Sequence, residues 1–170
     1  MTEDRIIPFT SFNFKIDITI GTDETLCNAA FSECDGLEMS MEVKTIKEGG
    51  NNSGPIHLIG PVSYGQLTLK RGMTDSFALW DWFEKVKRRD ASGYYGTCNV
   101  IMLSSVQPSS QQANNPYKDK PAEQVNFFLE CCLPVKLKAP SLNAKDGMIA
   151  IEEMTIAYQS LTIKRPENKG

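Results

Sequence analysis

Most hydrophobic side chains in this sequence recur at every second position, which is the period of a half-buried β-strand. Residues 12–20, FNFKIDITI, place their aromatic and isoleucine side chains on one face and polar side chains on the other. Residues 37–45, LEMSMEVKT, repeat this pattern, with Leu37, Met39, Met41 and Val43 on the apolar face. Further strands are predicted at 62–72, 97–106, 125–137 and 153–163.

The predicted strand at 125–137 is the longest, and alternation places all its odd-numbered residues, Cys131 included, on one face. Residues 97–106 are apolar on both faces, which is typical of a central strand. With six to eight strands in all, the pattern favours two packed antiparallel sheets in a sandwich or barrel-like arrangement. We expect residues 1–170 to form a single domain.

One segment, residues 76–89, has helical rather than strand periodicity, and Thr74 or Asp75 could cap its N-terminus. Its apolar positions are spaced i, i+3, i+4 and i+7 and form the predicted core face of one flanking helix: Leu79, Trp82, Phe83 and Val86. Trp80 points to a different side, because residues two apart on a helix do not share a face. It is therefore either at the rim of the core or in a subunit contact.

Two long loops are predicted. Residues 47–61, KEGGNNSGPIHLIGP, contain four glycines and two prolines between two strands. A hairpin needs only about two to five connecting residues, so we expect this loop to be mobile or to contact another structure. Residues 107–121, QPSSQQANNPYKDKP, are polar and bounded by prolines, which predicts a solvated surface loop.

Composition and charge exclude several function classes. The chain has 18 basic and 21 acidic residues, a net charge of −3, so it shows no basic footprint for nucleic acid or anionic membrane. No apolar run approaches the roughly 20 residues of a spanning helix, and the N-terminus does not resemble a signal peptide. The five cysteines, an odd number, are expected to be reduced thiols in a cytoplasm.

Candidate catalytic and metal sites all fail on spacing. His57 is the single histidine and has no carboxylate within eight residues, so an exposed side chain with one hydrogen bond is the simpler interpretation. Glu38 and Glu42 share a strand face roughly 13 Å apart, too far for a glycosidase pair. Cys131 and Cys132 point to opposite faces, which does not suit zinc. We expect no enzyme activity, metal or cofactor.

The strands leave two kinds of protein open. Polar strand faces could line a wet channel if sheet edges paired between subunits until a ring closed. The alternative is a monomeric β-sandwich ligand-binding module, which would need exposed aromatic residues clustered on one face. The candidates, Tyr94, Tyr95 and Tyr117, all lie in predicted loops.

Residues 46–86 carry a more specific signal. An acidic-Gly-Gly-x-Asn loop is followed by Leu-x-Gly, an aromatic residue, Leu-x-Leu-Lys-Arg-Gly and a tryptophan-bearing helix. The matching residues are Glu48, Gly49, Gly50, Asn52, Leu58, Gly60, Tyr64, Leu67, Leu69, Lys70, Arg71, Gly72, Trp80 and Trp82. In this order and spacing the segment resembles the inner-tube proteins of contractile injection systems, a family that includes the tail tube proteins of contractile-tailed phages.

The resemblance implies a structural subunit that forms hexameric rings with a lumen-lining β-barrel, stacked into a hollow tube. The implied partners are further copies of the chain, a contractile sheath, a baseplate or spike hub, a tube terminator, and cargo in the lumen, either protein toxin or DNA. The resemblance does not separate a phage tail from a toxin-delivery particle. It implies assembly in the bacterial cytoplasm, then a place in an extracellular, cytoplasmic or membrane-docked phage tail-like particle or in a virion tail, without a direct membrane anchor.

The resemblance also implies roles for particular residues. The inter-ring contact is assigned to Lys47, Glu48, Gly49, Gly50, Asn51 and Asn52. A second group of motif and subunit-contact residues comprises Leu67, Leu69, Lys70, Arg71 and Gly72. Within it, Lys70 and Arg71 either pair with acids of an adjacent subunit or are solvated, and Gly72 relieves backbone strain before the helix.

Overall fold

The computed structural model describes residues 11–21, 24–29, 31–47, 49–50, 54–88, 94–103, 123–145 and 147–165. The strands are β1 (Phe14–Ile20), β2 (Glu24–Ala29), β3 (Glu33–Asp35), β4 (Met39–Ile46), β5 (Ile56–Tyr64), β6 (Gln66–Gly72), β7 (Gly96–Leu103), β8 (Glu123–Lys138), β9 (Ile151–Ala157) and β10 (Ser160–Lys164). The helix α1 spans Ala78–Lys87. The described residues thus form a mainly β fold with one helix, as the pattern predicted.

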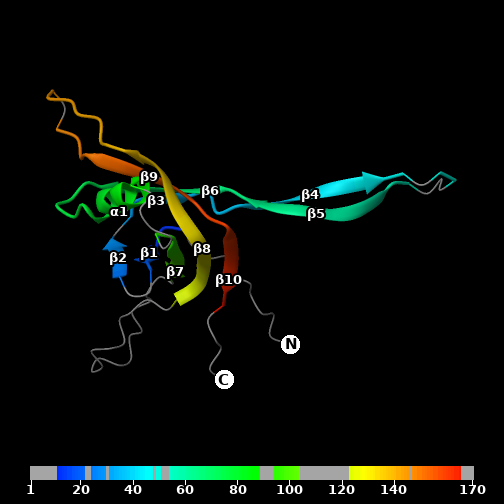
Figure 1. Ribbon diagram of the computed structural model, residues 1–170. Coiled ribbons are helices and arrows are strands. Elements are labelled where there is room, and N and C mark those ends of the chain that lie inside the picture. Colours follow the sequence, from blue (N-terminus) through cyan, green and yellow to red (C-terminus); the bar gives the residue numbers. More distant parts are fainter. Residues whose placement is uncertain are drawn as a thin grey trace, which may run out of the picture.

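Strand β8 belongs to two antiparallel sheets, because its two halves have different neighbours (Figure 1). Its first half pairs with β7 and β10, which gives a first sheet in the order β2-β1-β7-β8-β10. Its second half pairs with β9, which gives a second sheet in the order β8-β9-β6-β3. The two sheets are therefore continuous through β8 and fold over each other.

Cys131 forms the corner between the two halves of β8. Its backbone φ is 53°, the left-handed region, and the register with β7 shifts at this point. The extra residue reverses the alternation, so Leu129 and Cys132 are both buried while Cys131 is exposed. The prediction that Cys131 shares a face with Leu129 was wrong, because a β-bulge bends the strand and changes which side chains face the core.

The described residues form one hydrophobic core, which lies between the sheets and under the helix. It is formed by side chains from both sheets and from α1: Ile16, Ile18, Ile20, Cys98, Val100, Leu129, Cys132, Leu67, Leu69, Met154, Ile156, Leu79 and Trp82. Val86 packs against this core and Phe83 is half-buried. Trp82 lies over Gly96, and its Nε1–H donates to the backbone oxygen of Tyr94 at 3.1 Å. Phe12, by contrast, precedes β1 and is exposed.

The helix begins later than the capping pattern predicted. Its first residue is Ala78, and Phe77 occupies the N-cap position without a side-chain hydrogen bond. The Thr74 hydroxyl accepts a hydrogen bond from the Ser76 amide instead of capping the helix. The physical reason lies in β6, where the Arg71 guanidinium donates to the Ser76 carbonyl at 3.0 Å and so holds the connection to the helix against the sheet.

Candidate assembly surfaces

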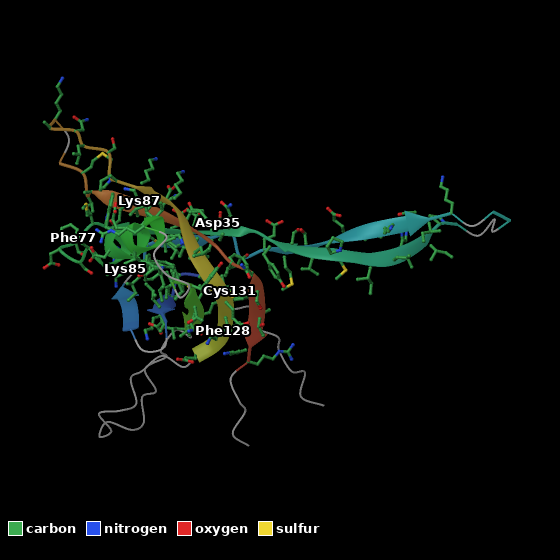
Figure 2. All side chains as sticks on the ribbon, in the orientation of Figure 1. Asp35, Phe77, Lys85, Lys87, Phe128 and Cys131 are labelled. Atoms are coloured by element: carbon green, nitrogen blue, oxygen red, sulfur yellow. The ribbon has the colours of Figure 1, made fainter. Side chains whose placement is uncertain are left out.

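Strands β4 and β5 form a two-stranded hairpin that leaves the body of the molecule (Figure 1). All eight residues of β4 are exposed, including Met39, Met41 and Val43. The prediction that 37–45 is a half-buried strand was therefore wrong for residues 39–45, whereas Leu37, which precedes β4, packs against the core. The alternation is real, but β4 pairs only with β5 among the described strands, so neither face meets the core. Figure 2 shows side chains projecting from both sides of the hairpin ribbon.

The predicted loop 47–61 is shorter than expected, because residues 56–61 belong to β5. Gly60 and Pro61 lie at a bulge, where two residues of β5 oppose Glu42. At a bulge, the missing N–H of a proline does not interrupt the ladder. A Cβ on Gly60 would meet the Glu42 carbonyl oxygen at 2.4 Å, so this close approach requires glycine.

One face of the hairpin is a continuous apolar surface, which we call the apolar hairpin face. Cross-strand pairing places three pairs of side chains on it: Met39 with Tyr64, Met41 with Val62, and Val43 with Ile59. Ile59 is 85% exposed. Exposed apolar surfaces of this kind mark sites of contact with another macromolecule.

Of the residues assigned to the inter-ring contact, the structure describes Lys47, Gly49 and Gly50, which follow β4. Gly50 has a φ of 96°, where glycine is favoured, whereas Gly49 lies in open space without this requirement. Lys47 is exposed. Glu48, Asn51 and Asn52 lie outside the described residues, as does the predicted loop 107–121. The inter-ring role of these residues stays a prediction.

Tyr158 fixes the base of the hairpin to the body. Its hydroxyl oxygen accepts from the Glu38 amide at 2.9 Å, and its hydrogen can be donated to the carbonyl of Gly36 or of Glu38, each also at 2.9 Å. Gly36 has a φ of 94°, and a Cβ there would lie 2.0 Å from the backbone carbonyl oxygen of Gln66. The direction of the hairpin is therefore set by backbone contacts at its base. Sequence reasoning missed this role of Tyr158, for which spacing offers no signal.

The Leu-x-Leu-Lys-Arg-Gly motif lies in β6 and mostly faces the interior of its own chain. Leu67 and Leu69 are core residues and Arg71 is 2% exposed, so these three side chains are not available to a neighbouring subunit. Lys70 forms a salt bridge with Glu33 of the same chain. The backbone φ of Gly72 is not positive. The prediction that Gly72 relieves backbone strain before the helix was therefore wrong.

Arg71 is the centre of a buried polar cluster that neither prediction for it anticipated. Its Nε donates to Glu152 Oε1, while the Trp80 Nε1–H donates to Glu152 Oε2 at 2.9 Å. Trp80 is thus tied to the sheet by its indole nitrogen, at the rim of the core. The pairing could not be found from the sequence, because 81 residues separate Arg71 from Glu152.

The second sheet has two open edges of opposite charge. On one side, no described strand pairs with the outer edge of residues 133–138 in β8, where Lys136 and Lys138 are exposed. On the other side, β3 pairs only with β6, and Glu33 and Asp35 are exposed. Open edges present unpaired backbone groups that can pair with another chain.

The residues considered for catalysis, metal binding and ligand binding do not form a site in the described part of the chain. Within the described part of the chain, no group of three or more potential ligands could hold a metal ion. His57 is exposed and shares a single hydrogen bond of 3.3 Å with Thr45, although it lies in β5 and not in a loop. Of the aromatic residues considered for ligand binding, Tyr95 is exposed, Tyr94 is half-buried, and Tyr117 lies outside the described residues. No described helix is long and apolar enough to cross a bilayer.

A match to a protein-family model shows the family of the chain. The model of the T4-like virus tail tube protein gp19 family matches residues 10–162. The chain belongs to this tail tube protein family. No curated protein sequence matches the tail tube chain.

Solved structures share the fold of this tail tube protein. A chain of the anti-feeding prophage baseplate, 6-fold symmetrised, is 22% identical with a TM-score of 0.75, covering 95% of this chain and 98% of the other. A chain of the PVC sheath–tube complex, an extracellular contractile injection system in the extended state, is 15% identical with a TM-score of 0.72, covering 97% and 99%. A chain of the anti-feeding prophage tube-terminating cap is 16% identical with a TM-score of 0.73, covering 97% and 96%. At these identities the likeness is one of fold.

The family assignment identifies the chain as a structural tube protein and not an enzyme. The function of a tube protein depends on surfaces that contact other subunits. The apolar hairpin face and the two open edges of the second sheet are the features of the described residues that suit such contacts.

Proposed function

We propose that copies of this tail tube protein join their second sheets edge to edge in a closed hexameric ring, and that the rings stack into a hollow conduit. The apolar hairpin face carries the proposal, because a monomer would leave five of its six side chains exposed to water: Met39, Met41, Val43, Ile59 and Val62. The 6-fold symmetrised baseplate, which contains a chain of the same fold, supports six copies per ring.

The ring contact follows from the order of the second sheet. Its four strands alternate in direction, so β3 of one copy can lie antiparallel to residues 133–138 of β8 in the next copy. Lys136 and Lys138 would then face Glu33 and Asp35 across the junction. Complementary charges of this kind favour the correct partner and register more than they add affinity. Repeating one heterologous contact around an axis closes a ring without free edges.

The partners of the tube are proposed from proteins of the same fold. Their structures contain a sheath, a baseplate and a terminating cap. We expect this protein to occupy the equivalent position in a phage tail or an extracellular contractile particle, after assembly in the bacterial cytoplasm. Cargo, either protein or DNA, would travel through the lumen when the sheath contracts.

Negative-stain electron microscopy of the purified protein tests the proposal. We expect rings and hollow rods from the unmodified chain. Lys138→Glu should abolish rings, because it places like charges across the proposed junction, whereas Lys87→Glu on the exposed side of α1 should leave them intact. Dispersed monomers from the unmodified chain at high concentration would instead favour the ligand-binding module and refute the ring.

A further inference from the structure

The β4–β5 hairpin is joined to the body through two short connections (Figure 1). Residues 36–38 lead from β3 into β4, and Gly65 is the single residue between β5 and β6. Among the described strands, β4 and β5 pair only with each other, so the other strands do not fix the angle of the hairpin. The direction of the hairpin relative to the body therefore depends on contacts at this base.

One side chain from the body, Tyr158, lies against both connections. Its hydroxyl group meets the Glu38 amide, the Gly36 carbonyl and the Glu38 carbonyl, each at 2.9 Å. The Gly65 amide donates to the same Glu38 carbonyl at 3.0 Å, and a Cβ on Gly65 would lie 3.1 Å from the Gly36 carbonyl oxygen. The two connections are thus packed against each other, and a single phenol hydroxyl group links them to the body.

Tyr158 is itself held firmly, because it lies where the chain passes from the second sheet to the first. It follows β9 and precedes β10, and it is 5% exposed. The amide of the next residue, Gln159, donates to the Glu130 carbonyl of β8 at 3.1 Å. The Tyr158 ring lies 5.8 Å from the ring of Tyr64, the last residue of β5. The hydroxyl group therefore ties the hairpin to the core that both sheets share.

We propose that Tyr158 is the positioning residue of the hairpin, whose hydroxyl group holds the hairpin in one direction before any second copy binds. A segment that is mobile before association must be ordered on binding, and this ordering reduces affinity. The apparent affinity falls in proportion to the fraction of chains in the competent direction. Tyr158 should thus lower the protein concentration at which tubes form. This last consequence rests on the proposed function, whereas the direction of the hairpin can be measured in dispersed chains.

Tyr158→Phe tests the hydroxyl group alone, because it keeps the buried ring. Glu38→Pro removes the amide donor of the same hydrogen bond and changes no core residue, since Glu38 is exposed. Tyr64→Phe is the matched control, because it also removes one phenol hydroxyl group at the hairpin base, but that group has no hydrogen bond with a described residue. Circular dichroism and urea denaturation check that each chain is folded.

Single-molecule energy transfer at sub-nanomolar concentration measures the direction of the hairpin without assembly. Dyes are attached to Lys44→Cys on β4 and Lys87→Cys on α1, both at exposed positions. The background carries Cys27→Ser and Cys131→Asn, so that these two thiols are not labelled. Labelling at pH 7 spares the remaining thiols, because burial raises their pKa.

We expect one narrow distance distribution for the parent chain and for Tyr64→Phe, but a broad distribution for Tyr158→Phe and Glu38→Pro. Sedimentation of tubes over a range of concentrations should place the assembly threshold of Tyr158→Phe about fivefold higher, the effect of one lost hydrogen bond. A narrow distribution for Tyr158→Phe, a broad one for the parent chain, or an unchanged threshold would overturn this inference and leave the proposed function standing. Failure of the unmodified chain to form rings would overturn the proposed function, but the distance distributions would still decide the role of Tyr158.

Discussion

At the scale of single residues, the buried pair of Arg71 and Glu152 links three parts of the fold. Both residues are 2% exposed, and each makes a further hydrogen bond, from Arg71 to the Ser76 carbonyl and from Trp80 to Glu152. Arg71 also lies 6.0 Å from the centre of the Phe31 ring. The cluster thus joins β6 and β9 to the segment that begins α1.

Replacing one member of this pair should be strongly destabilising. Glu152→Gln leaves the Arg71 guanidinium buried without a counter-charge, which typically costs about 3–5 kcal/mol in the free energy of unfolding. Urea denaturation of the dispersed protein measures the change. Lys70→Gln is the control, because the pair of Lys70 with Glu33 is solvent-exposed and its loss should change stability little. Equal effects of the two substitutions would contradict the role assigned to Arg71.

The thiols should differ sharply in reactivity. Burial raises the pKa of Cys132 to about 12, and burial followed by the charge of Asp35 raises the pKa of Cys34 to about 12. Burial also raises the pKa of Cys98. At pH 8 these thiols hold little reactive thiolate, whereas Cys131 is exposed, so iodoacetamide should label Cys131 first among these four. Mass spectrometry of a labelling time course checks this, and rapid labelling of Cys132 in the folded chain would contradict it.

The same shifts predict a dependence of stability on pH. A thiol whose pKa is raised in the folded state favours folding while it is protonated in both states. That contribution is present below the ordinary thiol pKa of 9.0 and is lost as the pH rises toward about 12. Thermal unfolding of the dispersed protein should therefore occur at lower temperature as the pH rises through this range. Cys132→Ala should weaken the dependence.

At the scale of elements, the hairpin shows how local backbone geometry determines a surface. The bulge at Gly60 keeps Val43 and Ile59 on the same face as Met41 and Val62, although β5 contains an extra residue. Without that bulge, a one-residue slip would move one strand's apolar side chains to the other face. The apolar hairpin face therefore depends on a single close backbone contact.

Gly60→Ala should disrupt this face without unfolding the body. The added methyl group would lie 2.4 Å from the Glu42 carbonyl oxygen, so the strands would have to separate or shift register. We expect loss of long tubes in electron microscopy and little change in thermal unfolding of the dispersed chain, because the hairpin lies outside the core. Gly49→Ala is the matched control, since a Cβ there meets no atom within 4 Å. Normal tubes from Gly60→Ala would show that the hairpin geometry is not needed.

At the scale of the whole molecule, the residues that stabilise the fold differ from the residues that we propose for assembly. The core between the two sheets and α1 is complete within one chain. The apolar side chains of β4 and β5, Leu142, Met148 and Ile149 in the connection between β8 and β9, and the open edges of the second sheet have no cover in the described residues. A chain of this kind can fold first and assemble afterwards. Its resistance to unfolding should then depend on how many neighbours it has.

Assembly should raise the apparent stability of the protein. Contacts made only by the folded chain stabilise it by mass action, so assembled tubes should unfold at a higher temperature than dispersed chains. Ile59→Glu separates the two states, since Ile59 is exposed and its replacement should not weaken the isolated fold. Differential scanning calorimetry at several protein concentrations measures the effect. Equal transition temperatures for tubes and for the Ile59→Glu chain would show that the contacts add no stability.

The amino-acid sequence by itself determined several of the longer strands, the helix and part of the core. Alternation identified β1 and β4, and helical spacing identified Leu79 and Trp82, because these patterns depend only on the period of each element. The single strands predicted at 62–72 and 153–163 were wrong in extent, since the first covers the end of β5 and all of β6, and the second covers parts of β9 and β10. The short strand β3 and the strand β2 left no such pattern. The order of motif residues across 46–86 also indicated the tube family, which the match to residues 10–162 showed.

Only the tertiary structure decided which faces are buried and which charges meet. The bulge at Cys131 reverses the inward face of β8, the hairpin carries β4 away from the core, and folding brings Glu152 to Arg71. Each of these depends on contacts between residues far apart in the chain. A periodic pattern shows that a strand has an apolar face, but the partner of that face is determined by the packing of the whole molecule, and here we propose that it is another copy.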